Sequence, residues 1–134
     1  MNVEIKQTNT EERVLESISR TGIADRTFVS SFTASIVRRI GEVDPHVRRW
    51  LLVDRWDIAA MRLFDEATAQ GLCLGVASAT EVVLEDLVRR EIPVVVWTVN
   101  EPGRLRDLLQ AGVAGLISDF PAMAARERRA LQER

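Results

Sequence analysis

The polar residues of this sequence that could do chemistry stand at the ends of short apolar runs. Glu4 and Lys6 close "NVEIK", a serine pair (Ser30 and Ser31) lies in "FVSSF", and three later runs end in Asp54, Asn100 and Asp119. Carboxylate oxygens are the ligands that hard cations such as Ca²⁺ and Mg²⁺ prefer. In a parallel α/β barrel, polar side chains gather at the carboxyl ends of the strands, where such enzymes keep their chemistry.

The first run leaves the orientation of its charged residues open. Alternation along an extended segment places Val3 and Ile5 on one side and Glu4 and Lys6 on the other. A strand with one apolar and one charged face usually turns the charged face to water. The pattern alone therefore allows Glu4 and Lys6 to face either solvent or a site.

A repeating strand and helix unit must position these residues. We expect strands at six runs, which are "VEIK", "TFVSSF", "RWLLVD", "LCLGV", "IPVVVWTV" and "AGLISD". Helical stretches of about three turns lie between them. One of these, "DIAAMRLFDEATAQG", has an N-cap candidate in Asp57 and a terminator in Gly71. The unit recurs about six times, at a spacing of about 20 to 25 residues.

This alternation predicts parallel strands joined by helical crossovers, in one of two architectures. An open doubly wound sheet is one, although no glycine-rich phosphate loop follows any of the expected strands. A (β/α)₈ barrel fits the polar strand ends better, but it typically needs about 250 residues. The chain has 134 residues, so the pattern leaves an open sheet and an incomplete barrel as alternatives.

The closing stretch "VVVWTVNEPGRLRDLLQAGVAGLISDFP", residues 94–121, resembles the C-terminal end of the glycerophosphodiester phosphodiesterase family. In that family a "WTVN" strand, a helix and a "G-V-x-G-I-I-(T/S)-D-x-P" strand close the barrel. "NVEIK" resembles the family's "EIK" strand, and "FVSSF" resembles its "SF" segment; Ala114 stands where the family often has Asp. The resemblance implies an α/β fold of the TIM-barrel (β/α)₈ type, incomplete, with about six of eight βα units in a single domain over residues 1–134.

The resemblance also implies a site. Glu4 would be a ligand of a divalent cation, Ca²⁺ or Mg²⁺, and Lys6 would contact the substrate phosphate. Ser31, Phe32 and Trp97 would line the substrate pocket, although a tryptophan in an apolar strand is as often core as contact. The complete enzyme would hydrolyse a glycerophosphodiester to sn-glycerol 3-phosphate and an alcohol.

The family's first two strands carry "HRG", "E-x-D" and "HD", and none of these motifs occurs in this chain. The single histidine, His46, lies between an expected helix and strand, and we interpret it as a surface or capping residue. We therefore predict no catalytic residue here, weak metal binding by the chain alone, and a truncated enzyme with little or no activity. The alternatives are a non-catalytic remnant that binds a phosphate or a partner, and an unrelated open-sheet binding domain.

Composition bounds the remaining expectations. With 46% hydrophobic residues, 28% charged residues and a net charge of −2, the chain is typical of a soluble globular domain and shows no basic footprint for nucleic acid. We expect no leader and no membrane span, and the lone Cys73 favours a reducing compartment, so we expect the cytoplasm. Two missing units would leave unpaired strand edges, which predicts self-association or a partner chain that supplies the missing strands.

Overall fold

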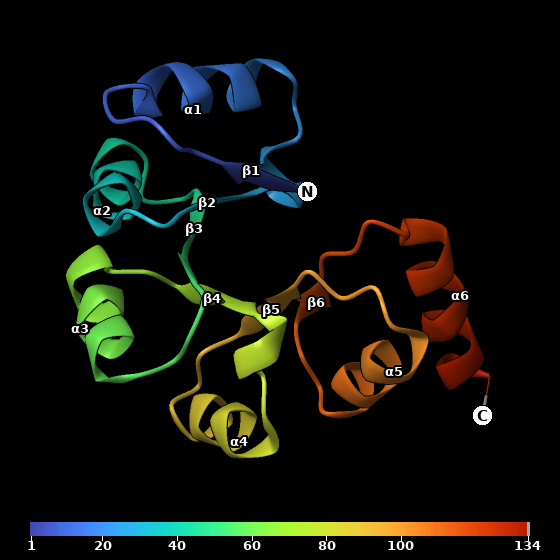
Figure 1. The fold of residues 1–134 in the computed structure, drawn as a ribbon. Coiled ribbons are helices and arrows are strands. Elements are labelled where there is room, and N and C mark those ends of the chain that lie inside the picture. The colour runs from blue at the N-terminus through green and yellow to red at the C-terminus, as the bar shows by residue number, and fades with distance from the viewer. Residues whose placement is uncertain (134) are drawn as a thin grey trace.

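The computed structural model describes residues 1–133, and in it six parallel strands form one curled sheet. The strands follow chain order across the sheet, and each pairs in parallel with the next. Figure 1 looks into the curl, with the strands inside and the helices around them. The strands are β1 (Asn2–Glu4), β2 (Phe28–Ser31), β3 (Arg48–Val53), β4 (Gly71–Gly75), β5 (Val94–Trp97) and β6 (Gly115–Leu116).

The α-helices of the described chain all lie on the outer face of the sheet, one after each strand (Figure 1). Two short 3₁₀ helices lie in the connections: η1 (Ala24–Arg26) precedes β2, and η2 (Val76–Ser78) follows β4. The helices are α1 (Glu11–Arg20), α2 (Ala34–Val43), α3 (Ile58–Ala67), α4 (Glu81–Arg89), α5 (Pro102–Gln110) and α6 (Pro121–Gln132). This is the arrangement of an α/β barrel of which six βα units are present, which confirms the predicted fold class.

Strand alternation divides the apolar residues into an outer layer and an inner layer. Every second strand residue packs outward against the helices, as Val29 does beneath Leu15 and Leu51 does beside Val37. The residues between them point into the curl, where Trp50, Leu52, Cys73 and Val95 form a separate buried cluster. The identity of each inward-facing residue therefore follows from its parity along the strand.

The ends of the helices follow local chemistry, with one correction to the sequence-based expectation. Asp57 is the N-cap of α3, as predicted, and its carboxylate accepts a hydrogen bond of 2.9 Å from the Ala60 backbone N–H. Gly71 does not end this helix. The helix ends three residues earlier, at Thr68, which takes the left-handed conformation with φ of 49°. Gly71 instead begins β4, where a Cβ atom would collide with the Trp50 ring.

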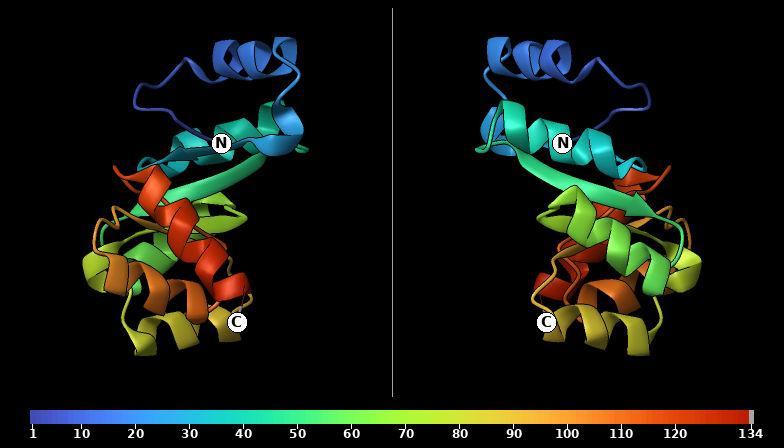
Figure 2. Two further views of the ribbon diagram at one scale, coloured as in Figure 1. Left: turned by 90° about the vertical axis from the view of Figure 1, so that its right-hand side faces the viewer. Right: turned by 90° about the vertical axis from the view of Figure 1, so that its left-hand side faces the viewer.

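The sheet has two edges, β1 and β6, each with a single neighbouring strand in the described chain. In Figure 1 these edges and their helices, α1 and α6, border the side of the curl that is not closed by strands. The side view in Figure 2 (left) looks at this open side, with the N-terminus at the start of β1 above α6. The six strands thus follow the curvature of a barrel without completing it.

Candidate functional site

Glu4 points into the curl of the sheet and away from the outer helices. Its neighbours Val3 and Ile5 pack outward, in the cluster that includes Leu15 of α1. Because successive strand residues face opposite sides, Glu4 must point inward. A second observation agrees with this placement: the negative charge of Glu4 contributes to the raised pKa of Cys73, which belongs to the inner cluster on β4.

The Glu4 carboxylate and the Lys6 ammonium group form an ion pair of 3.8 Å at the carboxyl end of β1. Their side chains are 32% and 79% exposed, so solvent screens this pair strongly and its contribution to stability is small. The structure therefore brings together the two residues that the resemblance pairs. The Lys6 ammonium group remains exposed, so an anion in solvent can reach it.

The serine pair of β2 is divided between the two faces of the sheet. Ser30 faces inward, where its hydroxyl donates a hydrogen bond of 2.7 Å to the Asn2 side-chain oxygen. Ser31 is only 1% exposed, donates to the Ile5 carbonyl at 2.7 Å, and accepts from the Thr33 backbone N–H. In this structure Ser31 fixes the chain path after β2, and Ser30 is the serine that shares the face of Glu4.

Two aromatic rings meet across the carboxyl end of the sheet. Phe32, just after β2, and Trp97, at the end of β5, lie edge to face with ring centroids 5.7 Å apart. Phe32 is 47% exposed, whereas Trp97 is half-buried against the inner cluster. The Trp97 indole N–H is buried and donates no hydrogen bond to any residue in the part of the chain that the structure describes. These rings form an apolar wall that a ligand alkyl group could contact.

A polar network closes the same end of the sheet at the other edge. The Asn100 amide donates to the Asp119 carboxylate at 2.7 Å, and its oxygen accepts from the Asp119 backbone N–H at 3.0 Å. The Ser118 hydroxyl also donates to the Asn100 oxygen. These hydrogen bonds connect the loop after β5 with the loop after β6 and hold the two loops together at the carboxyl end of the sheet. Sequence reasoning placed Asn100 and Asp119 at this rim but not in mutual contact.

The inner face contains one thiol that sequence reasoning did not assign to the site. Cys73 is fully buried among Trp50, Leu52 and Val95. Burial raises the pKa of its thiol from 9.0 to about 12, and the Glu4 carboxylate adds to the rise. A thiol with so high a pKa is a poor nucleophile, so Cys73 serves as a packing residue beneath the polar rim.

The oxygen donors of this face do not amount to a cation site within the described chain. No group of three or more His, Cys, Asp or Glu side chains lies close enough together among residues 1–133 to hold a metal ion. Glu4 supplies one carboxylate, and its ion-pair partner is Lys6. Divalent cations in proteins usually take two or more carboxylates or substrate phosphates, so this donor set does not fit a metal without further ligands.

His46 lies far from this face, in the connection that leads into the amino end of β3. It is exposed, and its backbone N–H donates to the Asp44 carboxylate at 3.0 Å. The strands are parallel, so the amino end of β3 is opposite to the end that carries Glu4. The interpretation of His46 as a surface residue is confirmed.

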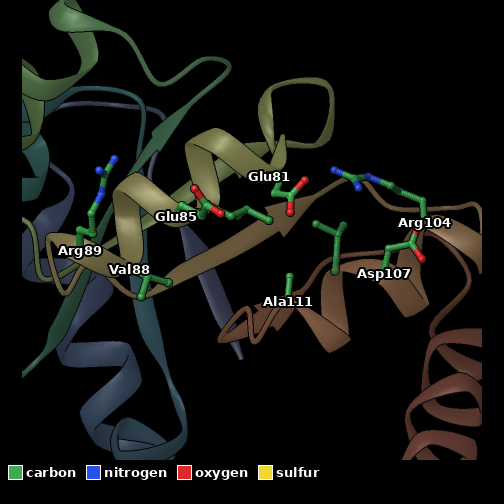
Figure 3. Close-up of a pocket in the computed structure, with 9 residues that line it drawn as sticks. Glu81, Glu85, Val88, Arg89, Arg104, Asp107 and Ala111 are labelled. Atoms are coloured by element: carbon green, nitrogen blue, oxygen red, sulfur yellow. The ribbon is translucent and has the colours of Figure 1, made fainter.

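A hollow lies on the outer surface, between α4 and α5 (Figure 3). Its volume is about 670 Å³, and Glu81, Glu85, Arg104 and Asp107 surround an apolar floor. The Arg104 guanidinium donates to the Ala79 carbonyl, which anchors one wall. The sheet separates this hollow from the inward-facing Glu4, so the two are distinct surfaces.

Comparison with known proteins assigns the chain to a family. The family model described as "Glycerophosphoryl diester phosphodiesterase family" matches residues 1–123. The chain therefore belongs to the glycerophosphoryl diester phosphodiesterase family, as its closing motif predicted.

Individual relatives agree with this family and show how much of it the chain covers. The uncharacterized protein YqiK of Bacillus subtilis (strain 168) is 30% identical over 132 residues, which cover 93% of this chain and 54% of that protein. A glycerophosphodiester phosphodiesterase of Caldanaerobacter subterraneus subsp. tengcongensis is 25% identical over 131 residues, which cover 90% and 52%. The chain thus spans about half the length of these relatives.

A solved structure shows the same fold. The phosphodiesterase of Oleispira antarctica, in complex with the product sn-glycerol-3-phosphate, superimposes with a TM-score of 0.78. The superposition covers 96% of this chain and 54% of that enzyme, at 18% sequence identity.

No helix among residues 1–133 has both the length and the apolar character needed to cross a bilayer.

Proposed function

We propose that this chain forms the six C-terminal βα units of a barrel that hydrolyses a glycerophosphodiester to sn-glycerol 3-phosphate and an alcohol, and that it has little or no activity alone. The observation that carries the proposal is the inward orientation of Glu4, with Lys6 3.8 Å away at the carboxyl end of β1. Family membership supports the reaction class. The buried free thiol of Cys73 supports a reducing compartment, such as the cytoplasm.

The roles proposed for individual residues follow from their chemistry. Glu4 would donate a carboxylate oxygen to a divalent cation, Ca²⁺ or Mg²⁺, that other carboxylates must complete. A bound cation of this kind would neutralise charge that develops on the phosphodiester. Lys6 would contact the phosphate oxygens through its exposed ammonium group. The single histidine, His46, lies at the opposite end of the sheet, so we expect the general acid and base to come from elsewhere.

The pocket wall is proposed to recognise the rest of the substrate. Phe32 and Trp97, which lie edge to face at the carboxyl end of the sheet, would pack against the glycerol or alcohol portion of the substrate. Ser31 remains a proposed pocket residue through its place beside Phe32, although its hydroxyl already bonds Ile5. Ser30, which faces inward, joins the proposal because it shares the face of Glu4.

The phosphate contact can be tested directly, because Lys6 is the only lysine of the sequence. In protein with ¹³C-labelled lysine, titration with sn-glycerol 3-phosphate should shift the single lysine ε-CH₂ signal as the ammonium group meets the dianion. A matched titration with glycerol should leave the signal unmoved. Equal shifts with both ligands, or none with sn-glycerol 3-phosphate, would contradict the proposed contact.

The same protein, assayed alone with glycerophosphocholine and either Mg²⁺ or Ca²⁺, should release choline at the background rate. The reason is that the described chain offers no cluster of ligands for the cation and no histidine at the rim. Turnover that disappears in Glu4→Ala would show that the chain is catalytic by itself. Turnover that persists in Glu4→Ala would indicate a contaminating enzyme.

The second candidate function is a non-catalytic domain that binds a phosphate compound or a partner. The exposed Lys6 ammonium group favours it, because an anion contact requires no metal and no acid–base pair. The two candidates separate when further βα units are added. Hydrolysis that then appears and depends on Glu4 supports the enzyme, and phosphate binding without hydrolysis supports the binding domain.

A further inference from the structure

The hollow between α4 and α5 is one part of a longer groove along these two helices. It has a volume of about 670 Å³, and Glu81 at the start of α4 lines it. A second hollow, of about 420 Å³, extends it to the segment before β5 and to the loop after α5, where Ile92 and Val113 line it. Val88 and Ala111 line both hollows. The two hollows therefore form one continuous surface, the α4–α5 groove.

Each of the two helices turns one regular face to this groove. The lining positions are 81, 84, 85, 88 and 89 on α4 and 104, 107, 108 and 111 on α5. Spacings of three and four residues place these side chains on a single stripe of each helix, as on a helix face that packs against a neighbour. Neighbouring helices elsewhere on the outer face do pack together: α1 contacts α2, α2 contacts α3, and α5 contacts α6. The facing stripes of α4 and α5 border the groove instead (Figure 3).

The floor of the groove is apolar, and apolar side chains on its walls are exposed. Leu84 and Leu108 are buried at its base. Val88 stands on the α4 wall with 68% of its surface exposed, and Ala111 is exposed on the α5 wall. Because removal of apolar surface from water favours association, a partner that covers Val88 and Ala111 would be stabilised in the groove.

The charge of the groove favours a cationic partner. Four carboxylates line it, and none of them forms an ion pair among residues 1–133. They belong to Glu81, Glu85, Glu91 and Asp107. The two lining arginines already have acceptors within the chain: Arg89 pairs with Asp86 at 3.4 Å, and Arg104 donates to the Ala79 carbonyl. Basic side chains on a partner would complement this surface.

The shape of the groove favours a helix over an extended segment. Both borders are helices, whose backbone groups are paired within the helix, so the groove offers no strand edge to which an extended peptide could bond. A helix laid between two helices can place its side chains between theirs. Both α4 and α5 have 9 residues, so a helix of about three turns would cover them.

We propose that the α4–α5 groove binds an amphipathic helix of a partner protein. The apolar side of that helix covers Val88 and Ala111, and its basic side chains lie beside Glu85 and Asp107. The groove is on the outer face of the sheet, so this inference does not depend on the proposed hydrolysis.

Fluorescence anisotropy with a designed probe tests the proposal on the full chain. The probe is a fluorescein-labelled peptide of about 14 residues, with leucines on one helical face and arginines on both flanks. It should bind saturably, at least about tenfold more tightly than a peptide of the same composition in scrambled order. A peptide with glutamates in place of the arginines should bind at least about tenfold more weakly than the probe.

Two valines of α4 provide a matched pair of variants. Val82 and Val88 are 72% and 68% exposed, and of the two only Val88 lines the groove. Val88→Gln should weaken binding of the probe about fivefold or more, whereas Val82→Gln should change it less than about twofold.

The carboxylates provide a second pair. Glu85→Gln should weaken binding about two- to threefold at low salt, and the difference should disappear at high salt. Glu66→Gln, at an exposed position of α3 outside the groove, should have no such effect. Circular dichroism checks that all four variants remain folded.

Three results would overturn the proposal. Absent binding, or equal binding of the ordered and the scrambled peptide, would show that the groove is not a helix site. Equal effects of Val88→Gln and Val82→Gln would place the probe elsewhere on the surface. Self-association of the chain that Val88→Gln disrupts, measured by light scattering, would make a second copy the occupant. No readout involves hydrolysis, so each of these results would leave the proposed function untouched.

Discussion

At the scale of single residues, strand parity decides what each side chain can do. Glu4 faces the curl because Val3 and Ile5 pack outward, and this resolves the alternative that the sequence left open. Parity also separates Ser30 from Ser31, which the sequence could not do, because "VSS" allows either serine to face inward. The register of a strand against its helices is a tertiary property, and it is not encoded in a run of two identical residues.

Cys73 provides a residue-scale prediction. Its thiol is fully buried, and burial together with the Glu4 charge raises its pKa to about 12. At pH 8 only about one thiol in ten thousand would be ionised, against about one in ten for a thiol with the ordinary pKa of 9.0. Alkylation of the native chain by iodoacetamide should therefore be at least about 100-fold slower than alkylation in urea.

The measurement is the rate of mass increase at pH 8 in buffer and in urea, with Cys73→Ala as the control for reaction elsewhere. A native rate within a few-fold of the rate in urea would contradict the burial of this thiol, and with it the closed packing of the inner cluster.

At the scale of elements, the sequence predicts which segments form but is less reliable about where they stop. All six strands occur where the apolar runs predicted them, and Asp57 caps α3. The helix nevertheless ends at Thr68 instead of Gly71, and Gly71 lies in β4, where a Cβ atom would collide with the Trp50 ring. The sequence alone does not distinguish a glycine needed for close packing from a glycine that ends a helix.

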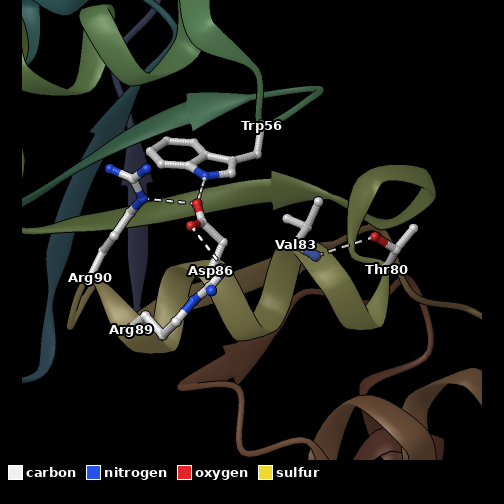
Figure 4. A network of polar contacts seen from close by, with 6 residues as sticks. All are labelled: Trp56, Thr80, Val83, Asp86, Arg89 and Arg90. Carbon is white, nitrogen blue, oxygen red and sulfur yellow. Dashed lines mark hydrogen bonds and ion pairs between the residues drawn. The ribbon is translucent and has the colours of Figure 1, made fainter.

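One contact between elements gives a prediction about pH. The Asp86 carboxylate of α4 accepts from the Trp56 indole N–H at 3.0 Å and from Arg90 at 2.8 Å (Figure 4). These bonds, that of Trp56 first, lower the pKa of Asp86 below its ordinary value of 3.8. The resulting stabilisation is therefore fully present above pH 3.8 and is lost as the pH falls below it, through the folded-state pKa.

Trp56→Phe removes the largest cause of this shift while retaining an aromatic ring beside Phe64. The urea midpoint of the variant should thus fall less steeply between about pH 4 and pH 2 than that of the parent chain. Asp86→Asn, which cannot titrate, should flatten the same region further. Parallel pH profiles for all three proteins would contradict the role of the Trp56–Asp86 bond.

At the scale of the whole molecule, the sequence predicts the architecture through a family motif and a repeat. The repeat alone could not choose between an open sheet and an incomplete barrel, because both alternate strands and helices. The curl of the sheet makes the difference, and curvature arises from strand twist and inner side chains such as Trp50 and Val95 packing together. A short sequence pattern does not predict the curvature of a sheet. The "WTVN" and "GLISD" segments predicted it indirectly, because they resemble segments of a family whose members form barrels.

The uneven enclosure of this sheet should appear as a gradient of local stability. The central strands β3, β4 and β5 each have neighbours on both sides and contain fully buried residues such as Leu51, Leu72 and Val96. The edge strands β1 and β6 are short and only partly buried, so they can open without unfolding the centre. The expected pattern can be measured by native-state hydrogen exchange. Amides of residues 50–53, 72–74 and 94–96 should exchange only through global unfolding.

Amides of residues 2–4 and 115–117 should exchange at least about 100-fold faster, through local opening of the edge strands. Leu51→Ala should accelerate the central amides by the full loss of global stability, about 2–5 kcal/mol, and change the edge amides little. Equal protection of edges and centre in the isolated chain would mean that another surface already covers β1 and β6, and would contradict the open barrel.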